Sequence, residues 1–284
     1  MNARLLLVAD SHLAPGNTLA SDNWAAITAH VAASRPDTVV HLGDLTVDGA
    51  GDPSQLTAAL PHLETLAAPW RIVPGNHDIG DNPVGGADHS VVSPERLAAW
   101  SDTFGSDRWR LDYDGWTILA LNAQLLDSGL DAEADQWAWL DDELAGLDRG
   151  QGLMLALHKP LLAPAEEREN APVYRFVPAG TADRLLGILR EFALAAVISG
   201  HVHQARTLDM DGIRHIWCPT SWATLGAGQP SFGFKLTGAV SVDLEPGRPP
   251  TADLVVPDGV GQATIGETTP NPYQGHPAFA RPAD

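Results

Sequence analysis

Short apolar runs recur along the chain, and each of them stops close to a glycine, an aspartate or a histidine. Runs of this length, rich in valine, isoleucine and leucine, predict buried β-strands. The clearest five lie at residues 5–9, 38–42, 70–73, 153–157 and 194–198. Between the first three, apolar residues return at every third or fourth position, so this part of the chain predicts alternating strands and helices.

Helical periodicity marks five segments. In the first, Trp24, Ile27 and Val31 share one face, and serines stand where an N-cap is expected, at Ser21, Ser54 and Ser93. The predicted helices cover residues 22–34, 54–67, 94–103, 134–147 and 181–191.

The second half of the chain is typical of antiparallel pairs. Hairpins are predicted where strands 108–113 and 116–122, and then 204–210 and 213–217, flank an Asp-Gly turn. Strands at residues 239–244 and 252–256 follow. An α/β sandwich of two mixed β-sheets flanked by helices accounts for both halves. We expect one domain over residues 1–257 and a C-terminal tail, rich in Pro, Gly and Thr, over residues 258–284.

The composition is that of an ordinary soluble chain: 284 residues, 44% hydrophobic and 19% charged. No apolar run approaches the roughly 20 residues that cross a bilayer. The apolar start is also too short for a secretory signal peptide. The single cysteine, Cys218, excludes an internal disulfide and suits a reducing compartment. We therefore expect a cytoplasmic protein that does not bind membranes.

Acidic residues outnumber basic ones by 36 to 17, which gives a formal net charge of −19. Without a Lys/Arg cluster to follow a nucleic-acid backbone, long DNA or RNA is not an expected substrate. An acidic chain repels anions at long range, so a phosphate ester would need local positive charge from bound metal ions. Oligomeric state is left open by the composition, and a homo-oligomer is compatible with it.

Side chains that ligate metals follow all five apolar runs. In chain order they are Asp10-Ser-His12, Gly43-Asp44, Gly75-Asn76-His77-Asp78, His158 and Gly200-His201-Val-His203. A strand end suits a ligand because the sheet fixes the backbone while the following loop lets the side chain point into a cleft. Five such ends side by side predict one metal site.

This set of residues indicates phosphoester hydrolysis. A phosphoester reacts slowly with water because its anionic oxygens repel a nucleophile. Two cations roughly 3.5–4 Å apart neutralise those oxygens and generate hydroxide from bound water near neutral pH. Mixed Asp, Asn and His ligation suits two divalent or mixed-valence ions of Mn, Fe, Zn or Co. Asp44, in the middle of the series, is the carboxylate we expect to bridge them.

The order D-x-H, G-D, G-N-H-D, H, G-H-x-H over residues 10–203 resembles the calcineurin-like metallophosphoesterase superfamily, in its single-domain bacterial phosphodiesterase-like branch. The resemblance implies a four-layer αββα sandwich. By the same resemblance the first metal is held by Asp10, His12, Asp44 and His203, and the second by Asp44, Asn76, His158 and His201. His77 would stand beside the leaving-group oxygen with Asp78 as its orienting partner, although Asp78 could also simply cap the loop after the strand.

Candidates for substrate contacts are Asn76, His89, Lys159, Tyr174 and Trp222. His89 lies in the Gly- and Asp-rich stretch 80–92, a candidate lid because long loops beside strand ends are commonly functional. Lys159 is either an exposed lysine, which we favour, or a ligand of a substrate phosphate. Relatives carry aromatic residues where Tyr174 and Trp222 stand, so these two could line the pocket mouth or could pack in the core or rim.

We expect a metal-dependent phosphoric ester hydrolase in which a metal-bridging hydroxide attacks phosphorus while His77 assists the leaving oxygen. Two divalent cations, two ligating aspartates and one hydroxide sum to about +1, which favours a diester monoanion. The resemblance suggests cyclic nucleotides or glycerophosphodiesters. A phosphomonoesterase of protein-phosphatase type stays open, because the segments starting at Gly75 and Tyr174 resemble that branch. A non-catalytic interaction scaffold is the remaining alternative, although no ligand is missing.

Overall fold

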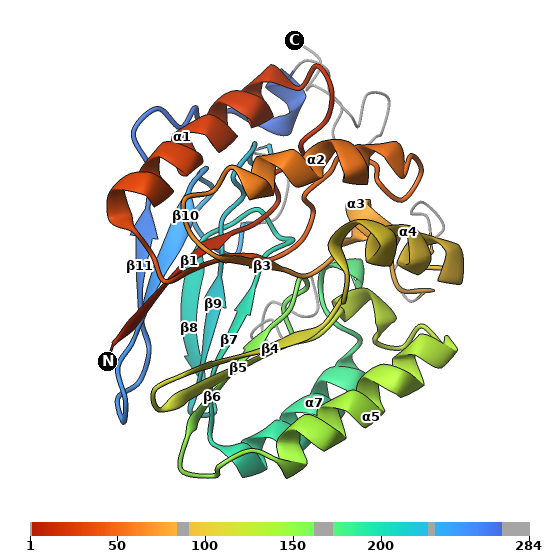
Figure 1. The fold of residues 1–284 in the computed structure, drawn as a ribbon, viewed down its shortest axis with the longest axis vertical. Coiled ribbons are helices and arrows are strands. Elements are labelled where there is room, and N and C mark those ends of the chain that lie inside the picture. The colour runs from red at the N-terminus through yellow and green to blue at the C-terminus, as the bar shows by residue number, and fades with distance from the viewer. Residues whose placement is uncertain (1, 84–90, 162–172, 227–230, 269–284) are drawn as a thin grey trace.

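The structure is a computed structural model that describes residues 2–83, 91–161, 173–226 and 231–268. Within these residues, two β-sheets face each other (Figure 1). The strand order is β11-β10-β1-β2-β3 in the first sheet and β4-β5-β6-β7-β9-β8 in the second.

The first sheet joins three parallel strands to an antiparallel pair. Its strands are β1 (Ala3–Val8), β2 (Thr38–His41), β3 (Trp70–Ile72), β10 (Ala239–Leu244) and β11 (Thr251–Val255). β1, β2 and β3 run parallel, with Leu7 opposite Val40, whereas β10 pairs with β1 in the antiparallel sense. The loops after β1, β2 and β3 therefore leave the sheet at one edge.

The second sheet has a parallel centre with an antiparallel strand on each side. Its strands are β4 (Trp109–Tyr113), β5 (Trp116–Ala120), β6 (Gly152–Ala156), β7 (Leu194–Ser199), β8 (Arg206–Met210) and β9 (Ile213–Trp217). β5, β6, β7 and β9 are parallel, and β4 and β8 are antiparallel to their neighbours. Both predicted hairpins are present, but β9 also joins β7 in parallel, which the hairpin pattern alone does not predict.

Helices cover the outer faces of both sheets (Figure 1). α1 (Thr18–Ser34) and α2 (Ser54–Glu64) lie against the first sheet, and α5 (Asp131–Ala145) and α7 (Ala179–Leu189) against the second. The remaining described helices are α3 (Asn76–Ile79), α4 (Pro94–Phe104), η2 (Ala123–Leu125), η3 (Val173–Arg175), η4 (Arg190–Phe192) and η5 (Ile265–Glu267). No helix in the described ranges is both long and apolar enough to pass through a bilayer.

Three apolar layers hold the sheets and helices together. One lies between the first sheet and α1 and α2, with Ile27 and Leu63 at its centre. A second lies between the two sheets around Leu7 and Ile198, and the third joins the second sheet to α5 and α7. This arrangement confirms the predicted four-layer αββα sandwich.

Helix ends differ from the prediction where local capping decides them. α1 begins at Thr18 because Asn17, not Ser21, is its N-cap and accepts a hydrogen bond from the amide of Ala20 at 3.3 Å. At α2 the N-cap position is occupied by Pro53, and Ser54, which was expected to be the cap, is the first residue of the helix. Ser93 caps α4 as predicted, through a bond from the amide of Arg96.

The first part of the predicted tail packs on the domain. The side chain of Ile265 is buried, and its amide donates to the carbonyl of Thr224 at 2.9 Å. The amide of Gly261 donates to the side-chain oxygen of Asn23 in α1 at 2.7 Å. The boundary at residue 257 stays a prediction.

Candidate metal centre

The loops after β1, β2, β3, β6 and β7 meet in one cluster of buried polar side chains. The Nε2 atoms of His12 and His203 lie 3.2 Å apart, although the two residues are 191 positions apart in the chain. The Nε2 atom of His158 lies 3.2 Å from Oδ1 of Asn76 and 3.1 Å from Nδ1 of His201. The structure thus brings together all seven residues expected as ligands from the sequence, with Asp10 and Asp44 described next.

Asp44 stands between the two histidine groups. Its Oδ2 atom is 3.3 Å from Nε2 of His158 and 3.9 Å from Nε2 of His12. Its Oδ1 atom accepts a hydrogen bond from the amide of His77 at 2.9 Å. On the other side of the cluster, Oδ1 of Asp10 is 3.5 Å from Nε2 of His203.

Three groups of ligand atoms, each within 4.8 Å of one another, could hold a metal ion. They are Asp10, His12 and His203; His12, Asp44 and His77; and Asp44, His158 and His201. Because Asp44 is shared by the last two groups, one carboxylate links both halves of the cluster.

The backbone at these residues is unusual. Five of the expected ligands have a positive φ: Asp10 (53°), His12 (45°), Asp44 (54°), His201 (70°) and His203 (53°). Left-handed conformations at non-glycine residues cost of order 1–3 kcal/mol each and gather at functional sites. Each of these residues lies in the loop that follows β1, β2 or β7, so the fold tolerates backbone strain at the strand ends where the ligand side chains are gathered.

Two glycines permit the close approach of the ligand loops. A Cβ at Gly75 would lie 2.1 Å from Oδ1 of Asp44, and one at Gly43 would lie 2.5 Å from Nδ1 of His158. Gly43 also has a φ of +93°, which L-residues rarely adopt. The glycines before Asp44 and Asn76 are therefore part of the site, since any side chain there would push ligands apart.

Backbone carbonyls orient two of the imidazole rings. Nδ1 of His158 donates to the carbonyl of Leu42 at 2.7 Å, and Nδ1 of His203 donates to the carbonyl of Ala223 at 2.7 Å. A donor proton on Nδ1 leaves a lone pair on Nε2 of each neutral ring, facing the cluster. Metal-binding histidines are held in this way, so the residues present fit a metal centre.

Burial and charge set the protonation of the cluster. Burial opposes ionisation of Asp44, but the imidazoles of His158 and His77 outweigh it and lower the pKa of Asp44 well below its usual value. Burial likewise opposes protonation of His158, but Asp44 raises its pKa to about 9. Burial raises the pKa of Asp10, an effect that His158 opposes and Asp44 reinforces. His12 and His201 have a pKa well below the usual value, chiefly through burial, and are neutral.

His77 and Asp78 have separate hydrogen-bond partners. Nδ1 of His77 donates to the carbonyl of Val47 at 2.7 Å, and its ring meets that of His12 edge-on with centroids 4.7 Å apart. Asp78 is buried and accepts from the amides of Leu45, Thr46 and Gly75 at 3.2, 2.9 and 2.9 Å. The carboxylate of Asp78 thus ties the loop after β2 to the turn after β3, which is the capping role considered as its alternative.

The expected substrate contacts lie in different surroundings. Lys159 is completely buried, so the expectation of an exposed lysine is wrong; its ammonium group is bound by Asp81 and Asn82. Trp222 is also completely buried and packs beneath His12, with ring centroids 5.0 Å apart. Tyr174 is partly exposed, and its carbonyl lies 3.3 Å from Nε2 of His201. His89 lies outside the described residues.

Sequence reasoning missed three polar residues beside the cluster. Asp81, Asn82 and Gln124 are buried at exposures of 3% or less. Asp81 and Asn82 stand directly after the G-N-H-D-I-G segment, and Gln124 lies in η2, shortly after β5. Their place in the sequence is typical of loops, so no signal in the pattern sets them apart from solvent-exposed residues.

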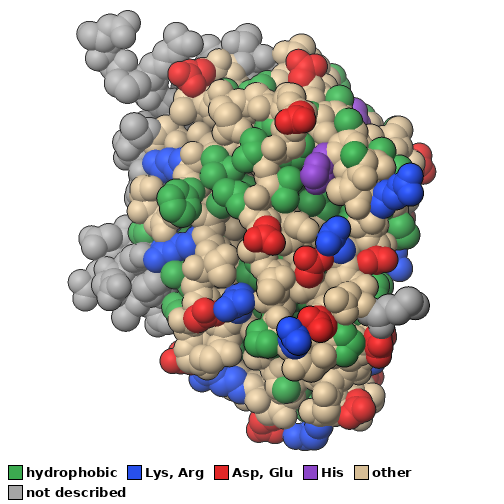
Figure 2. All heavy atoms as spheres, turned by 90° about the vertical axis from the view of Figure 1, so that its left-hand side faces the viewer, with side chains coloured by type: hydrophobic (Ala, Val, Ile, Leu, Met, Phe, Trp, Pro, Cys, Tyr) green, Lys and Arg blue, Asp and Glu red, His purple; other side chains and the backbone are tan. Residues whose placement is uncertain are grey.

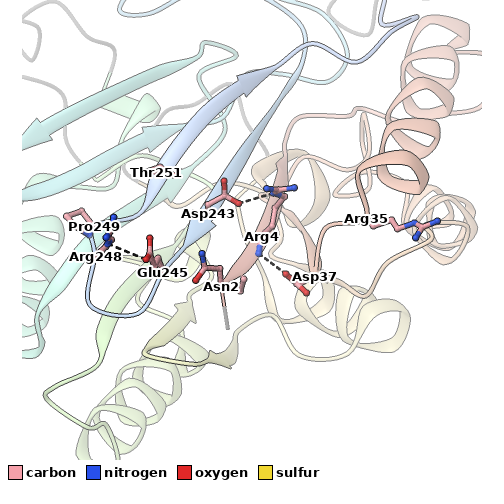
Figure 3. A pocket seen from close by; sticks show the side chains of 10 residues that line it. Asn2, Arg4, Arg35, Asp37, Asp243, Glu245, Arg248, Pro249 and Thr251 are labelled. Atoms are coloured by element: carbon pink, nitrogen blue, oxygen red, sulfur yellow. Dashed lines mark hydrogen bonds and ion pairs between the residues drawn. The ribbon is translucent and has the colours of Figure 1, made fainter.

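A hollow of about 490 Å³ lies at the end of the first sheet opposite the metal centre (Figure 3). Arg4 pairs with Asp243 at 2.9 Å and donates its amide to Asp37 at 2.7 Å, and Arg248 pairs with Glu245 at 3.3 Å. Most of the charges that line it are therefore paired with one another. On the face shown in Figure 2, basic and acidic side chains are interspersed, without a basic cluster among the described residues.

A four-layer αββα sandwich with Asp, Asn and His side chains gathered at strand ends defines a metal-dependent phosphoesterase. The sequence profile of the calcineurin-like phosphoesterase family matches residues 3–205, and the chain belongs to this family. It is a metal-dependent phosphoric ester hydrolase.

The chain is similar to both phosphodiesterases and phosphatases. It is 26% identical over 231 residues to a 3',5'-cyclic adenosine monophosphate phosphodiesterase of Escherichia coli, covering 77% of this chain and 76% of that protein. It is 28% identical over 170 residues to a serine/threonine-protein phosphatase of Bos taurus, covering 56% and 50%. A dimetal phosphatase from Danio rerio has the same fold, with a TM-score of 0.60, 16% identity and coverage of 89% and 95%.

Proposed function

We propose that the chain is a phosphodiesterase for small diesters that works with two metal ions. The observation that carries this proposal is the position of Asp44, whose carboxylate is shared by two groups of ligand atoms. A carboxylate placed in this way suits a bridge between two ions, and a single ion would leave one histidine group without a partner. Mn, Fe, Zn and Co all suit the donor set.

The ligands divide between the two positions by their contacts. Asp10, His12 and His203 supply the first position, together with one oxygen of Asp44. His158, His201 and Asn76 supply the second with the same carboxylate. Cations held there would neutralise phosphoryl oxygens and activate water as a nucleophile.

His77 is placed to assist the leaving group. Its ring lies against that of His12, and its Nδ1 donates a hydrogen bond to the carbonyl of Val47. The other ring nitrogen, Nε2, is then the one available on the side of the cluster. A histidine at this edge can donate a hydrogen bond or a proton to the departing oxygen. Asp78 positions it indirectly, since the bonds from Leu45 and Thr46 fix the loop that contains Asp44 and Val47.

Charge supports a diester as the substrate. Two divalent cations with the carboxylates of Asp10 and Asp44 and one hydroxide sum to about +1, which a diester monoanion brings to neutrality. A monoester dianion would leave excess negative charge in a chain of formal charge −19. The E. coli relative is named for a cyclic nucleotide diester, and cyclic nucleotides and glycerophosphodiesters are the small diesters we propose.

A phosphomonoesterase of protein-phosphatase type is the second candidate. The similarity to the bovine protein phosphatase supports it, although that match covers 56% of this chain. An interaction scaffold is a weaker candidate because all seven expected ligands are present and gathered in one place. We also propose that the enzyme is cytoplasmic, acts as a soluble catalyst on small molecules rather than long nucleic acid, and can form homo-oligomers.

Parallel kinetics test the proposal. Metal-stripped protein is reconstituted with Mn²⁺ and assayed on cyclic AMP, glycerophosphocholine, bis-p-nitrophenyl phosphate and p-nitrophenyl phosphate. The proposal expects a higher kcat/KM on the diesters. Higher values on the monoester favour the phosphatase, and inactivity on all four substrates with metal bound favours the scaffold.

A further inference from the structure

We infer that Lys159 is a positioning residue: its buried ion pair with Asp81 fixes Asn76 and His158, two ligands of the second metal position, relative to each other. The inference rests on the proposed function, because it assumes that this position binds a metal. It also assigns Lys159 a role other than the substrate contact considered from the sequence.

The ammonium group of Lys159 is bound by two side chains inside the protein. It binds Oδ1 of Asp81 and, at 2.7 Å, Oδ1 of Asn82, and no part of the side chain reaches solvent. A buried ammonium is stable only when it is paired and hydrogen-bonded, and both conditions are met here. A substrate phosphate would have to displace Asp81, which would leave a buried carboxylate without its cation.

The ion pair connects two loops that carry ligands. Lys159 follows His158 directly after β6, and Asp81 stands just beyond α3, the helix that begins at Asn76. The two ligands are in contact, with Nε2 of His158 3.2 Å from Oδ1 of Asn76. The salt bridge between Lys159 and Asp81 therefore connects the same two loops that also meet through the contact between His158 and Asn76.

Gln124 completes the connection. When its amide is oriented so that donor and acceptor face complementary groups, the nitrogen donates to Oδ1 of Asp81 at 3.0 Å and the oxygen accepts from the amide of Asn76 at 3.3 Å. A continuous path of polar contacts then runs from the backbone of Asn76 through Gln124 and Asp81 to Lys159, the residue next to His158. Groups that orient metal ligands in this way typically contribute 10–100-fold to metal affinity or activity.

The test uses the variants Lys159→Met, Asp81→Asn and the double variant that combines them. Asp81→Asn keeps an oxygen that can accept from Lys159, so it serves as the milder variant if Lys159→Met folds poorly. Arg214→Met is the matched control, because it breaks the ion pair with Asp209 at the far end of the second sheet. Mn²⁺ binding is followed by the loss of the EPR signal of the free ion, with thermal unfolding recorded in parallel.

The inference expects Lys159→Met to weaken one of two Mn²⁺ sites about 10–100-fold, while the other site and the KM at saturating metal stay unchanged. The double variant should recover thermal stability, because no charge is left unpaired, but not metal affinity. Arg214→Met should bind both ions normally.

Three results would overturn the inference. One is a raised KM with normal metal binding, which would make Lys159 a substrate contact. Another is recovery of metal affinity together with stability in the double variant, and the third is a fall in the stability of Lys159→Met with normal metal affinity. If the unmodified protein binds no second ion, the proposed function fails instead, so the two failures are distinguishable.

Discussion

Gly75→Ala probes the closest contact in the site without straining the φ and ψ angles of residue 75 itself. Gly75 has φ −103° and ψ −179°, an extended conformation that alanine adopts readily. The added Cβ would lie 2.1 Å from Oδ1 and 2.3 Å from the amide nitrogen of Asp44, whereas ordinary contacts begin near 3.4 Å. The carboxylate of Asp44 must therefore move by more than 1 Å, although metal–ligand distances are held to about 0.2 Å.

We expect this variant to fold and to lose metal affinity at both positions, because Asp44 serves both. Overpacking of this kind costs roughly 1–3 kcal/mol, which corresponds to a fall in Tm of a few degrees in a protein of this size, at about 2–4 °C per kcal/mol. Isothermal titration with Mn²⁺ and a thermal melt of the metal-free protein measure the two effects separately.

Gly187→Ala is the matched control, since a Cβ at this position, in the last turn of α7, meets nothing within 4 Å. It should bind metal normally and unfold at the same or a higher temperature, because alanine favours helices over glycine by roughly 0.5–1 kcal/mol. Full metal binding and activity in Gly75→Ala would refute the reasoning, because Asp44 would then tolerate a displacement that the bridge does not allow.

Three further predictions follow from individual side chains. His77→Ala should lower kcat by about 10²–10⁴-fold at unchanged metal content by atomic absorption, and an equal loss of metal would contradict its role at the leaving group. Because Asp44 raises the pKa of His158 to about 9, above its unfolded value, the protonated ring stabilises the metal-free protein fully below about pH 6.5. That contribution is lost as the pH rises through about 9, so the melting temperature of the metal-free protein should fall over this pH range. Mn²⁺ binding at pH 7 should release a proton, which calorimetry in two buffers measures. Binding without proton release would count against the assignment. Cys218 is buried and its thiol pKa is raised, chiefly by burial and further by Asp10, so it should react with Ellman's reagent only after unfolding, and rapid labelling of the native protein would contradict its burial.

Much of the fold follows from the hydrophobic pattern. The runs before Asp10 and Asp44 are short and apolar and form mostly buried strands, and the run before Asn76 forms β3, in which Ile72 is buried. The first residues of the helices were predicted less accurately, because the cap of α1 is the side chain of Asn17 and not Ser21, the serine nearest the apolar positions. Parallel pairing of β9 with β7 depends on contacts between distant segments, which periodicity does not record.

The meeting of the expected ligands at one edge of the sheets was predictable because each of them lies within four residues of the end of a strand. That they bind metal stays a prediction. The surroundings of the ligands were not predictable, since they depend on which loops meet. Asp78 accepts hydrogen bonds from Leu45 and Thr46, which lie 33 and 32 positions away in the sequence. Lys159 likewise meets Asp81 across 78 positions, so a residue that resembles a surface lysine in the sequence becomes a buried cation.

The most direct measurement is a crystal structure grown with Mn²⁺, in which anomalous scattering locates the ions. We expect two peaks separated by roughly 3.5–4 Å, one beside Asp10 and His203 and one beside His158 and His201, with Asp44 in contact with both ions. A single peak, or two peaks that do not share Asp44, would contradict this expectation.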